Sequence, residues 1–420
     1  MTSRVTESAG SGGTVVVNGR EYRLPTRPTV VVTVDGGDPR YFDDALGRGL
    51  MPRLAGMLGT GDGGTYVRGL GQMPSLTNPN NLSIVTGVSA AVHGVPGNHY
   101  HAPSGEEVQL VDPSFVRAPS IHAEMQRAGV RVLAVTAKEK LRRLLGHGGV
   151  PAVSAELAHR LGLPAYGVDS VRALVGRDNP GIYDWDLSPY ALEIGLAAHR
   201  QLGGLDLLYV STTDFVQHKQ GPGGDLSDRF LVRLDELLGA YLDEGFLVGI
   251  TADHGMNAKQ QPDGTPRVHY LEDVLQAAGV KGYHVTLPIT DPYVLHHGAL
   301  GSFAWVDVGP AERETARAAI AALPGVEEVY TREEAAAIYG HPTDRIGDLS
   351  VASDAGTALG KALGKHDLSL VESGLRSHGG RHEQIVPIIV SHALSPRYAA
   401  RQAAGVSSSD LHDLVLNGVS

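Results

Sequence analysis

Five short apolar runs, rich in β-branched residues, recur along the chain between polar or turn-forming segments. Uninterrupted apolar runs of this length are typical of strands that are covered on both faces, as the strands of a parallel sheet are. We therefore expect these runs to form the central strands of a mostly parallel sheet. They occupy residues 29–34, 131–136, 205–210, 246–251 and 385–390.

Helical patterns lie between the predicted strands, for example at residues 120–128, 191–202 and 226–242. This alternation of strand and helix predicts an α/β sandwich in which helices cover both faces of the sheet. The chain has 420 residues, of which 42% are hydrophobic. That is enough to bury one large core, or a core with an inserted domain.

Residues 259–376 have a different pattern, which predicts a small α+β unit. Its elements are expected to be a strand at 301–308, a helix at 312–323, a strand at 326–330 and a helix at 332–338. We interpret the segment as a cap domain inserted into a catalytic core. The core would then comprise residues 21–258 and 377–420, preceded by a flexible tail at residues 1–20.

Composition and charge exclude several kinds of site and partner. Because the chain has no cysteine, disulfides, iron–sulfur clusters, thiolate zinc sites and cysteine nucleophiles are all excluded. The net charge of −11 argues against nucleic acid, which is bound through an excess of Lys and Arg, but a local pocket can still bind a small anion. No apolar run reaches about 18 residues, so we expect a cytoplasmic protein without membrane contact. A homodimer is left open.

Acidic residues follow three of the predicted strands. Asp35, Asp214 and Asp253 each lie just beyond the C-terminal end of a strand, where open α/β sheets bind their ligands. The spacing from Asp214 to His218 places a carboxylate and an imidazole on one face of a helical turn. Taken alone, such a pair is more often a surface contact, and a carboxylate after a strand is more often a helix cap. The three positions together favour a metal site.

Histidines complete this candidate metal site. His254 follows Asp253 directly and precedes Gly255, which permits a turn. A histidine from the far end of the sequence, His378 or His382, precedes the last predicted strand. Oxygen and imidazole ligands in a mixed set suit zinc, with manganese or iron as alternatives. Two groups of ligands suggest two metal ions about 4 Å apart, an arrangement that clamps a phosphoryl group during in-line displacement.

The candidate nucleophile is Thr77, in the segment MPSLTNPNNLSIVTG. Pro79 fits the first turn of a helix, and Asn78 is a plausible N-cap. Thr77 would then stand at a helix N-terminus, where free N–H groups and the helix dipole favour bound anions. Without the nearby carboxylates, Thr77 would more often be an alternative cap.

Taken together, these segments resemble the alkaline phosphatase superfamily and, within it, the phosphonoacetate hydrolases. The resemblance covers residues 31–390 in the family's order and implies an alkaline-phosphatase-like sandwich with a smaller inserted α+β cap. The matching segments are VDGGDPRYFDDAL, MPSLTNPNNLSIVTG, HGVPGNHY, TAKEKLRRLLG, STTDFVQHK, TADHGM, RSHGG and EQIVP.

The resemblance implies two zinc ions and a ligand set for each. His378 is preferred to His382 because its spacing to Val386 and Pro387 matches the closing histidine motif of the superfamily. The first zinc would be held by Asp35, Thr77, Asp253 and His254, and the second by Asp214, His218 and His378.

The implied reaction is hydrolysis of the C–P bond of phosphonoacetate to acetate and phosphate, through a phosphothreonine at Thr77. Asn98 would donate to a phosphonate oxygen, although a Gly-Asn turn is its ordinary interpretation. Lys138 and Lys140 would recognise the carboxylate of the substrate, and cations there would stabilise the charge that develops on the leaving fragment. In an extended segment both lysines point the same way, although such pairs are usually ordinary surface residues.

Two alternatives remain. Within the superfamily, a phosphodiesterase or nucleotide pyrophosphatase would use the same metals and Thr77 on esters. Such an enzyme is expected to have an aromatic slot for a base, whereas only 5% of this chain is aromatic. From a different class, a non-catalytic metal- or anion-binding protein would retain the ligands without turnover.

Overall fold

A seven-stranded sheet forms the centre of the computed structural model, which describes residues 13–59, 63–290, 297–369, 371 and 374–419. The strand order is β4-β19-β10-β3-β9-β7-β8. From β10 to β8 all neighbours are parallel, whereas β19 is antiparallel to both of its neighbours. The predicted mostly parallel sheet is therefore confirmed. Its strands are β3 (Thr29–Thr33), β4 (Thr65–Leu70), β7 (Val132–Thr136), β8 (Ala152–Ser154), β9 (Leu207–Ser211), β10 (Leu247–Thr251) and β19 (Ile385–Val390).

The two outermost strands, β4 and β8, are the ones that the sequence pattern does not predict. Most of β4 is half-buried or exposed, and β8 has only three residues. Neither strand carries a long apolar run, because an edge strand does not need to be covered on both faces. The five inner strands all coincide with predicted runs.

Consecutive residues of the inner strands enter two separate cores, one on each face of the sheet. In β3, Val30 and Val32 pack into one core and Val31 into the other. Burying such a valine completely stabilises the fold by roughly 1.5–3 kcal/mol. The first core is covered by α1 (Pro39–Gly47), α2 (Pro52–Gly59), α7 (Val171–Val175), α8 (Leu187–Gln201) and α10 (Asp225–Asp243). The second core is covered by α3 (Thr77–Thr86), α5 (Ile121–Arg127), α6 (Glu139–Leu145) and α15 (Leu411–Asn417).

A β-hairpin near the N-terminus corrects the predicted tail. Strands β1 (Thr14–Val17) and β2 (Arg20–Arg23) pair antiparallel around Asn18 and Gly19, which both have positive φ. Asn-Gly suits a two-residue hairpin turn, because both of its central positions need a left-handed backbone. The tail predicted at residues 1–20 therefore extends too far, since residues 14–20 belong to this hairpin; residues 1–12 lie outside the described part of the chain.

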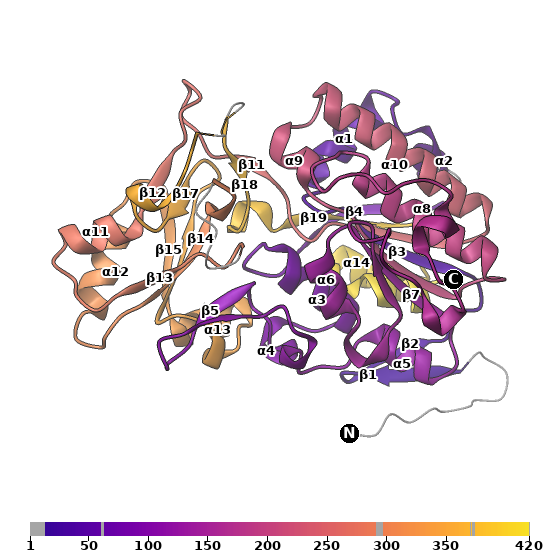
Figure 1. Cartoon of the computed structure of the whole chain (residues 1–420), viewed down its shortest axis with the longest axis horizontal. Helices are drawn as coiled ribbons and strands as arrows, with labels where there is room; N and C mark the ends of the chain where they lie inside the picture. Colours follow the sequence, from indigo (N-terminus) through magenta and orange to yellow (C-terminus); the bar gives the residue numbers. More distant parts are fainter. Residues whose placement is uncertain (1–12, 60–62, 291–296, 370, 372–373, 420) are drawn as a thin grey trace.

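Residues 259–376 leave the seven-stranded sheet between β10 and β19 and form sheets of their own (Figure 1). The larger one has four strands in the order β13-β14-β16-β15, and the chain enters and leaves through the paired strands β11 and β18. We call this segment the inserted unit. Its strands, with the two connecting ones, are β11 (Asn257–Ala258), β12 (Val268–Tyr270), β13 (His284–Thr286), β14 (Phe303–Asp307), β15 (Val326–Thr331), β16 (Leu349–Ser353), β17 (Ala358–Gly360) and β18 (Arg376–Ser377). Its helices are α11 (Leu271–Ala277), α12 (Arg313–Ala321) and α13 (Arg332–Tyr339).

A buried ion pair joins the first residue of the inserted unit to the core segment that follows the unit. Lys259 Nζ lies 2.8 Å from Glu383 Oε1, and both side chains are completely buried. Glu383 also accepts hydrogen bonds from the Asn257 side chain and from the Gly380 backbone. Because Gly380 follows His378 closely, this pair helps to fix the loop that carries that histidine.

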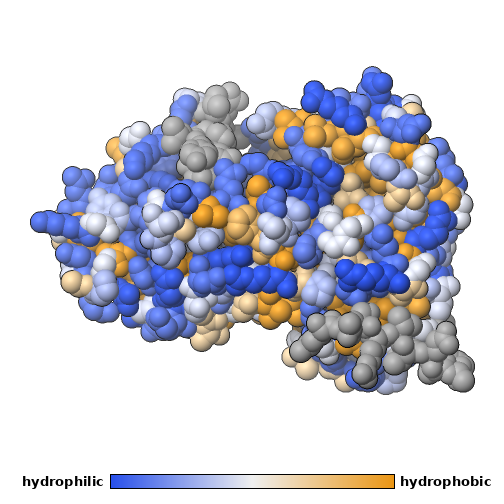
Figure 2. All heavy atoms as spheres, turned by 60° about the horizontal axis from the view of Figure 1, so that its bottom comes forward, coloured by the Kyte–Doolittle hydropathy of each residue, from blue (hydrophilic) through white to orange (hydrophobic). Residues whose placement is uncertain are grey.

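The remaining α-helices and strands lie outside residues 259–376 in the sequence, and one of them, at residues 99–101, contacts β13 of the inserted unit. They are α4 (Ala90–His93), β5 (His99–His101), β6 (Glu107–Gln109), α9 (Phe215–Lys219) and α14 (Pro396–Ala404). Figure 2 shows mainly hydrophilic residues on one face of the inserted unit, at the left, and more hydrophobic patches over the core. Within the described residues, every helix is too short or too polar to span a bilayer.

Candidate active site

The three acidic residues predicted from the strand ends lie together in the structure. Asp35 follows β3, Asp214 follows β9 and forms the N-cap position of α9, and Asp253 follows β10. Since β10, β3 and β9 are adjacent and parallel, their C-terminal ends lie at one edge of the sheet. All three carboxylates are buried.

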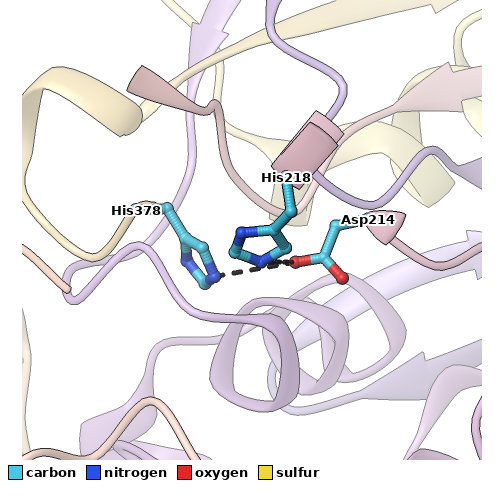
Figure 3. A group of neighbouring side chains, drawn as sticks. All are labelled: Asp214, His218 and His378. Atoms are coloured by element: carbon cyan, nitrogen blue, oxygen red, sulfur yellow. Dashed lines mark ion pairs between the residues drawn. The ribbon is translucent and has the colours of Figure 1, made fainter. Parts of the chain in front are cut away.

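Two groups of side chains in this region could each hold a metal ion. The first consists of Asp35, Asp214 and His254, and the second of Asp214, His218 and His378. In the second group, Asp214 Oδ2 lies 2.9 Å from His218 Nε2 and 3.7 Å from His378 Nε2 (Figure 3). In the first, His254 Nε2 lies 3.3 Å from Asp35 Oδ1. Asp214 is thus shared by both groups.

The backbone orients all three histidines in the same way. Their Nδ1 atoms lie 2.7–2.9 Å from the carbonyl oxygens of Gly255, Arg376 and Ser75, for His254, His218 and His378 respectively. A carbonyl only accepts, so Nδ1 must carry the proton in each ring. In the neutral ring this leaves the lone pair on Nε2, which faces the carboxylates, and such backbone partners are the usual outer support of metal-binding histidines.

The buried carboxylates of the site strongly shift the pKa values of the groups around them. Burial and the neighbouring Asp35 carboxylate raise the pKa of Asp253 well above its ordinary value. Burial lowers the pKa of His254, but the Asp253 and Asp35 carboxylates outweigh this effect and raise it to about 9. Burial also raises the pKa of Asp214, yet Lys138 and His218 together hold it well below the ordinary range. Three carboxylates crowded away from water therefore depend on nearby positive charge.

Asp35 provides the clearest test of whether a metal ion fits. Both of its carboxylate oxygens are buried, and neither has a hydrogen-bond partner among the described residues. Its charged neighbours are His254, with Nε2 3.3 Å from Oδ1, and Lys138, with Nζ 3.7 Å from Oδ2. A buried carboxylate that accepts no hydrogen bond is unfavourable, and a bound cation would satisfy its oxygens. The donor set of carboxylate oxygens and imidazole nitrogens matches a divalent transition metal. These residues could therefore bind metal ions.

Thr77 lies at this cluster, although the helix begins two residues earlier than predicted. Helix α3 begins at Thr77 itself, with Leu76 at the N-cap position and no side-chain cap. Asn78 is therefore inside the helix and is not its N-cap. Thr77 Oγ1 lies 3.3 Å from His254 Nε2, so its hydroxyl faces the first group of candidate ligands.

The two predicted lysines lie in different surroundings. Lys138 Nζ lies 2.8 Å from Asp214 Oδ1 and 3.7 Å from Asp35 Oδ2, between the two groups of candidate ligands. Lys140, in contrast, is an exposed residue in the first turn of α6. The extended geometry expected for this pair is wrong, because the helix begins at Glu139, directly after Lys138.

Asn98 and His382, the two remaining residues considered from the sequence, both contact the inserted unit. The Asn98 side chain donates to the Ile289 carbonyl at 2.8 Å, and its oxygen is buried without a hydrogen-bond partner in the described structure. It therefore borders the inserted unit. His382, the competitor of His378, is exposed and lies 2.8 Å from Glu327 of that unit. His378 instead stacks on His254, with ring centroids 3.6 Å apart.

Comparison with known proteins identifies the family to which the chain belongs. The model of the type I phosphodiesterase/nucleotide pyrophosphatase family matches residues 29–382. The chain belongs to this family. A phosphonoacetate hydrolase from Sinorhizobium meliloti 1021, solved with phosphonoformate, is 40% identical and has a TM-score of 0.90 over 97% of this chain and 99% of its own. The same enzyme solved with phosphonoacetate gives 0.89 over the same shares.

More distant members share the fold alone. Murine ectonucleotide pyrophosphatase/phosphodiesterase 5 is 18% identical, with a TM-score of 0.62 over 93% of this chain and 94% of its own. The resemblance to phosphonoacetate hydrolases and the alkaline phosphatase superfamily, stated from the sequence motifs, is therefore confirmed. As a member of this phosphodiesterase family, the protein is a hydrolase.

The sequence analysis did not identify one polar residue of the candidate site. Asn81 is completely buried, and its side-chain nitrogen lies 3.1 Å from Asp253 Oδ2 and 2.9 Å from the Thr77 carbonyl. A signal was present, because Asn81 follows Thr77 by four residues and so lies on the same helix face. The segment TNPNN contains three asparagines, however, and spacing alone could not show which of them reaches a carboxylate.

Proposed function

We propose that this protein hydrolyses the C–P bond of phosphonoacetate to acetate and phosphate, with Thr77 as the nucleophile. The 40% identity to a phosphonoacetate hydrolase over nearly the whole of both chains carries the choice of substrate. That enzyme was solved with phosphonoformate and with phosphonoacetate, two small anions. The position of Thr77 beside a buried carboxylate and histidine cluster supports the choice of nucleophile.

Seven side chains are proposed to hold two zinc ions. Bound zinc would act as a Lewis acid toward phosphoryl oxygens and would lower the pKa of a hydroxyl at the site. The shared position of Asp214 supports binding at adjacent sites, as do the buried oxygens of Asp35, which accept no hydrogen bond among the described residues. The proposed ligands are Asp35, Thr77, Asp253 and His254 for the first ion and Asp214, His218 and His378 for the second.

The proposed reaction has two displacement steps at phosphorus. Thr77 Oγ attacks phosphorus, so that the O–P bond forms while the P–C bond breaks and its electron pair passes to carbon. The adjacent carboxylate delocalises that pair, and one proton, which balances the proton that the Thr77 hydroxyl loses on attack, completes acetate. Water attacks the phosphothreonine, which releases phosphate and restores the threonine hydroxyl.

Three further side chains are proposed to bind the substrate. Lys138 and Lys140 would stabilise the carboxylate fragment as charge develops on it, because positive charge placed there favours the transition state over the ground state. The short distance from Lys138 to Asp214 supports its presence at the reacting centre. Asn98 would donate to a phosphonate oxygen. Its amide would either leave the Ile289 carbonyl or keep that hydrogen bond and donate its second N–H to the substrate.

Phosphate release from phosphonoacetate, compared with hydrolysis of an aryl phosphate diester, tests the proposal on zinc-loaded protein. We expect phosphonoacetate to be the far better substrate. The second candidate is a phosphodiesterase, which the matching family model favours. Preferential hydrolysis of the diester would establish that alternative, and turnover of neither compound would leave a non-catalytic binding protein.

A further inference from the structure

A chain of buried hydrogen bonds runs beneath the candidate site and links three strands with helix α3. Tyr209 Oη, from β9, lies 2.7 Å from Asn81 Oδ1, and Thr33 Oγ1, from β3, lies 2.9 Å from the same hydroxyl. Asn81 in turn reaches Asp253, after β10, and the carbonyl of Thr77. The side chains of Thr33, Asn81 and Tyr209 are completely buried.

The direction of these hydrogen bonds follows from the chemistry of the groups. The Thr77 carbonyl and the Asp253 carboxylate only accept, so both must face the NH2 group of Asn81. The amide oxygen of Asn81 then faces Tyr209, whose hydroxyl must donate to it. Burial raises the pKa of Tyr209 well above its ordinary value, which keeps that hydroxyl protonated. Thr33 can donate to Tyr209, so every member of the chain is satisfied.

This arrangement matters because Asn81 is bonded to two groups with different proposed roles. One N–H holds Oδ2 of Asp253, whose other oxygen accepts from the backbone N–H groups of Gly36 and His254. The other N–H holds the backbone of Thr77, the proposed nucleophile. A rotation of the Asn81 amide would therefore disturb the carboxylate and the nucleophile together.

We infer that Asn81 is a positioning residue, locked by Tyr209, that sets Asp253 and Thr77 in register for metal binding and attack. The inference rests on the proposed function, the metal-affinity part on the proposed zinc site and the kinetic part on the proposed reaction. Outer supports of metal ligands typically contribute roughly 10–100-fold to metal affinity or activity. A structural hydrogen bond elsewhere in the core would affect stability without affecting either quantity.

The test compares two buried tyrosines that each lose one hydroxyl. Tyr209→Phe removes the donor to Asn81. Tyr241→Phe is the control: Tyr241 lies near the C-terminal end of helix α10, its ring is equally buried, and its hydroxyl donates to the Leu192 carbonyl of α8. We expect Tyr209→Phe to weaken zinc binding roughly tenfold or more, measured by competition with a chromogenic chelator. It should lower kcat for phosphonoacetate by a similar factor with KM nearly unchanged. Tyr241→Phe should leave both at wild-type values.

A second variant, Asn81→Asp, places a carboxylate oxygen against Asp253 and the Thr77 carbonyl, and we expect a larger loss of zinc affinity. If this variant does not fold, the tyrosine pair still decides the question. Equal zinc affinity in Tyr209→Phe and Tyr241→Phe would overturn the inference, as would a wild-type protein that binds no zinc. Absence of phosphate release from the wild type would instead refute the proposed function, while the zinc titrations would still test the role of Asn81.

Discussion

Lys138→Met separates recognition of the leaving fragment from general damage to the site. The Lys138 ammonium lies 2.8 Å from Asp214 Oδ1 and 3.7 Å from Asp35 Oδ2, which raises the pKa of Lys138 although burial opposes it. One charge-assisted hydrogen bond to the substrate carboxylate is worth roughly 1.5–3 kcal/mol. Since about 1.4 kcal/mol corresponds to tenfold in rate, we expect phosphonoacetate turnover to fall by at least roughly tenfold.

An aryl phosphate diester provides the internal comparison in steady-state assays of phosphonoacetate and ester turnover. It has no carboxylate at the corresponding place and expels a stable phenolate, so its hydrolysis should change little. Zinc content should remain at the wild-type value, because the lost lysine competes with cations for Asp214. Lys140→Met is the matched variant, in the exposed first turn of α6. It should lower phosphonoacetate turnover less than Lys138→Met does. Equal losses for both substrates with Lys138→Met would mean that the lysine is structural, and the phosphodiesterase alternative would then lead.

Three other predictions concern the nucleophile, the metal ions and the inserted unit. Thr77→Ala should lower phosphonoacetate turnover by roughly a thousandfold or more with an unchanged circular dichroism spectrum, and substantial residual activity would exclude the covalent route. Chelation should abolish turnover and added zinc restore it, with two ions per chain by elemental analysis; Asp214→Ala should lose more zinc than His218→Ala, because only Asp214 is shared. Lys259→Met should lower the free energy of unfolding by about 3–5 kcal/mol in urea titrations, because it leaves Glu383 buried and unpaired, and Lys259→Met combined with Glu383→Gln should recover part of that loss. A destabilisation no larger than that of an exposed lysine variant would contradict this reasoning.

The sequence predicts the centre of the fold well and its edges poorly. The inner strands are covered on both faces and must be apolar throughout, so β3, β7, β9, β10 and β19 are visible as continuous runs. Edge strands such as β4 escape this requirement. The hairpin of β1 and β2 had a readable signal in Asn18-Gly19, but it adjoins a glycine- and serine-rich terminus whose composition favours a tail.

In the candidate site too, residues at the ends of strands could be placed from the sequence, whereas contacts that depend on tertiary packing could not. Asp35, Asp214 and Asp253 could be placed because parallel strands bring their C-terminal ends to one edge of the sheet. The lysines could not, because their geometry depends on the single residue at which β7 ends and α6 begins. A shift of one or two residues in the start of a helix changes the relative directions of two neighbouring side chains. Partners distant in the sequence, such as Asn81 and Tyr209, follow only from the packed structure.

The charge of the site explains how an acidic protein can select an anionic substrate. Three carboxylates, Asp35, Asp214 and Asp253, lie near two basic side chains, Lys138 and His254, so these five groups carry a net negative charge when all are ionised. Two divalent cations, as proposed, would reverse the sign and leave the site positive, although the whole chain has a net charge of −11. Buried surroundings screen such a local field less than water does, so the site would attract anions that the rest of the surface repels. Metal loading would then control substrate capture as well as chemistry, so the affinity for phosphonate inhibitors should fall together with zinc content.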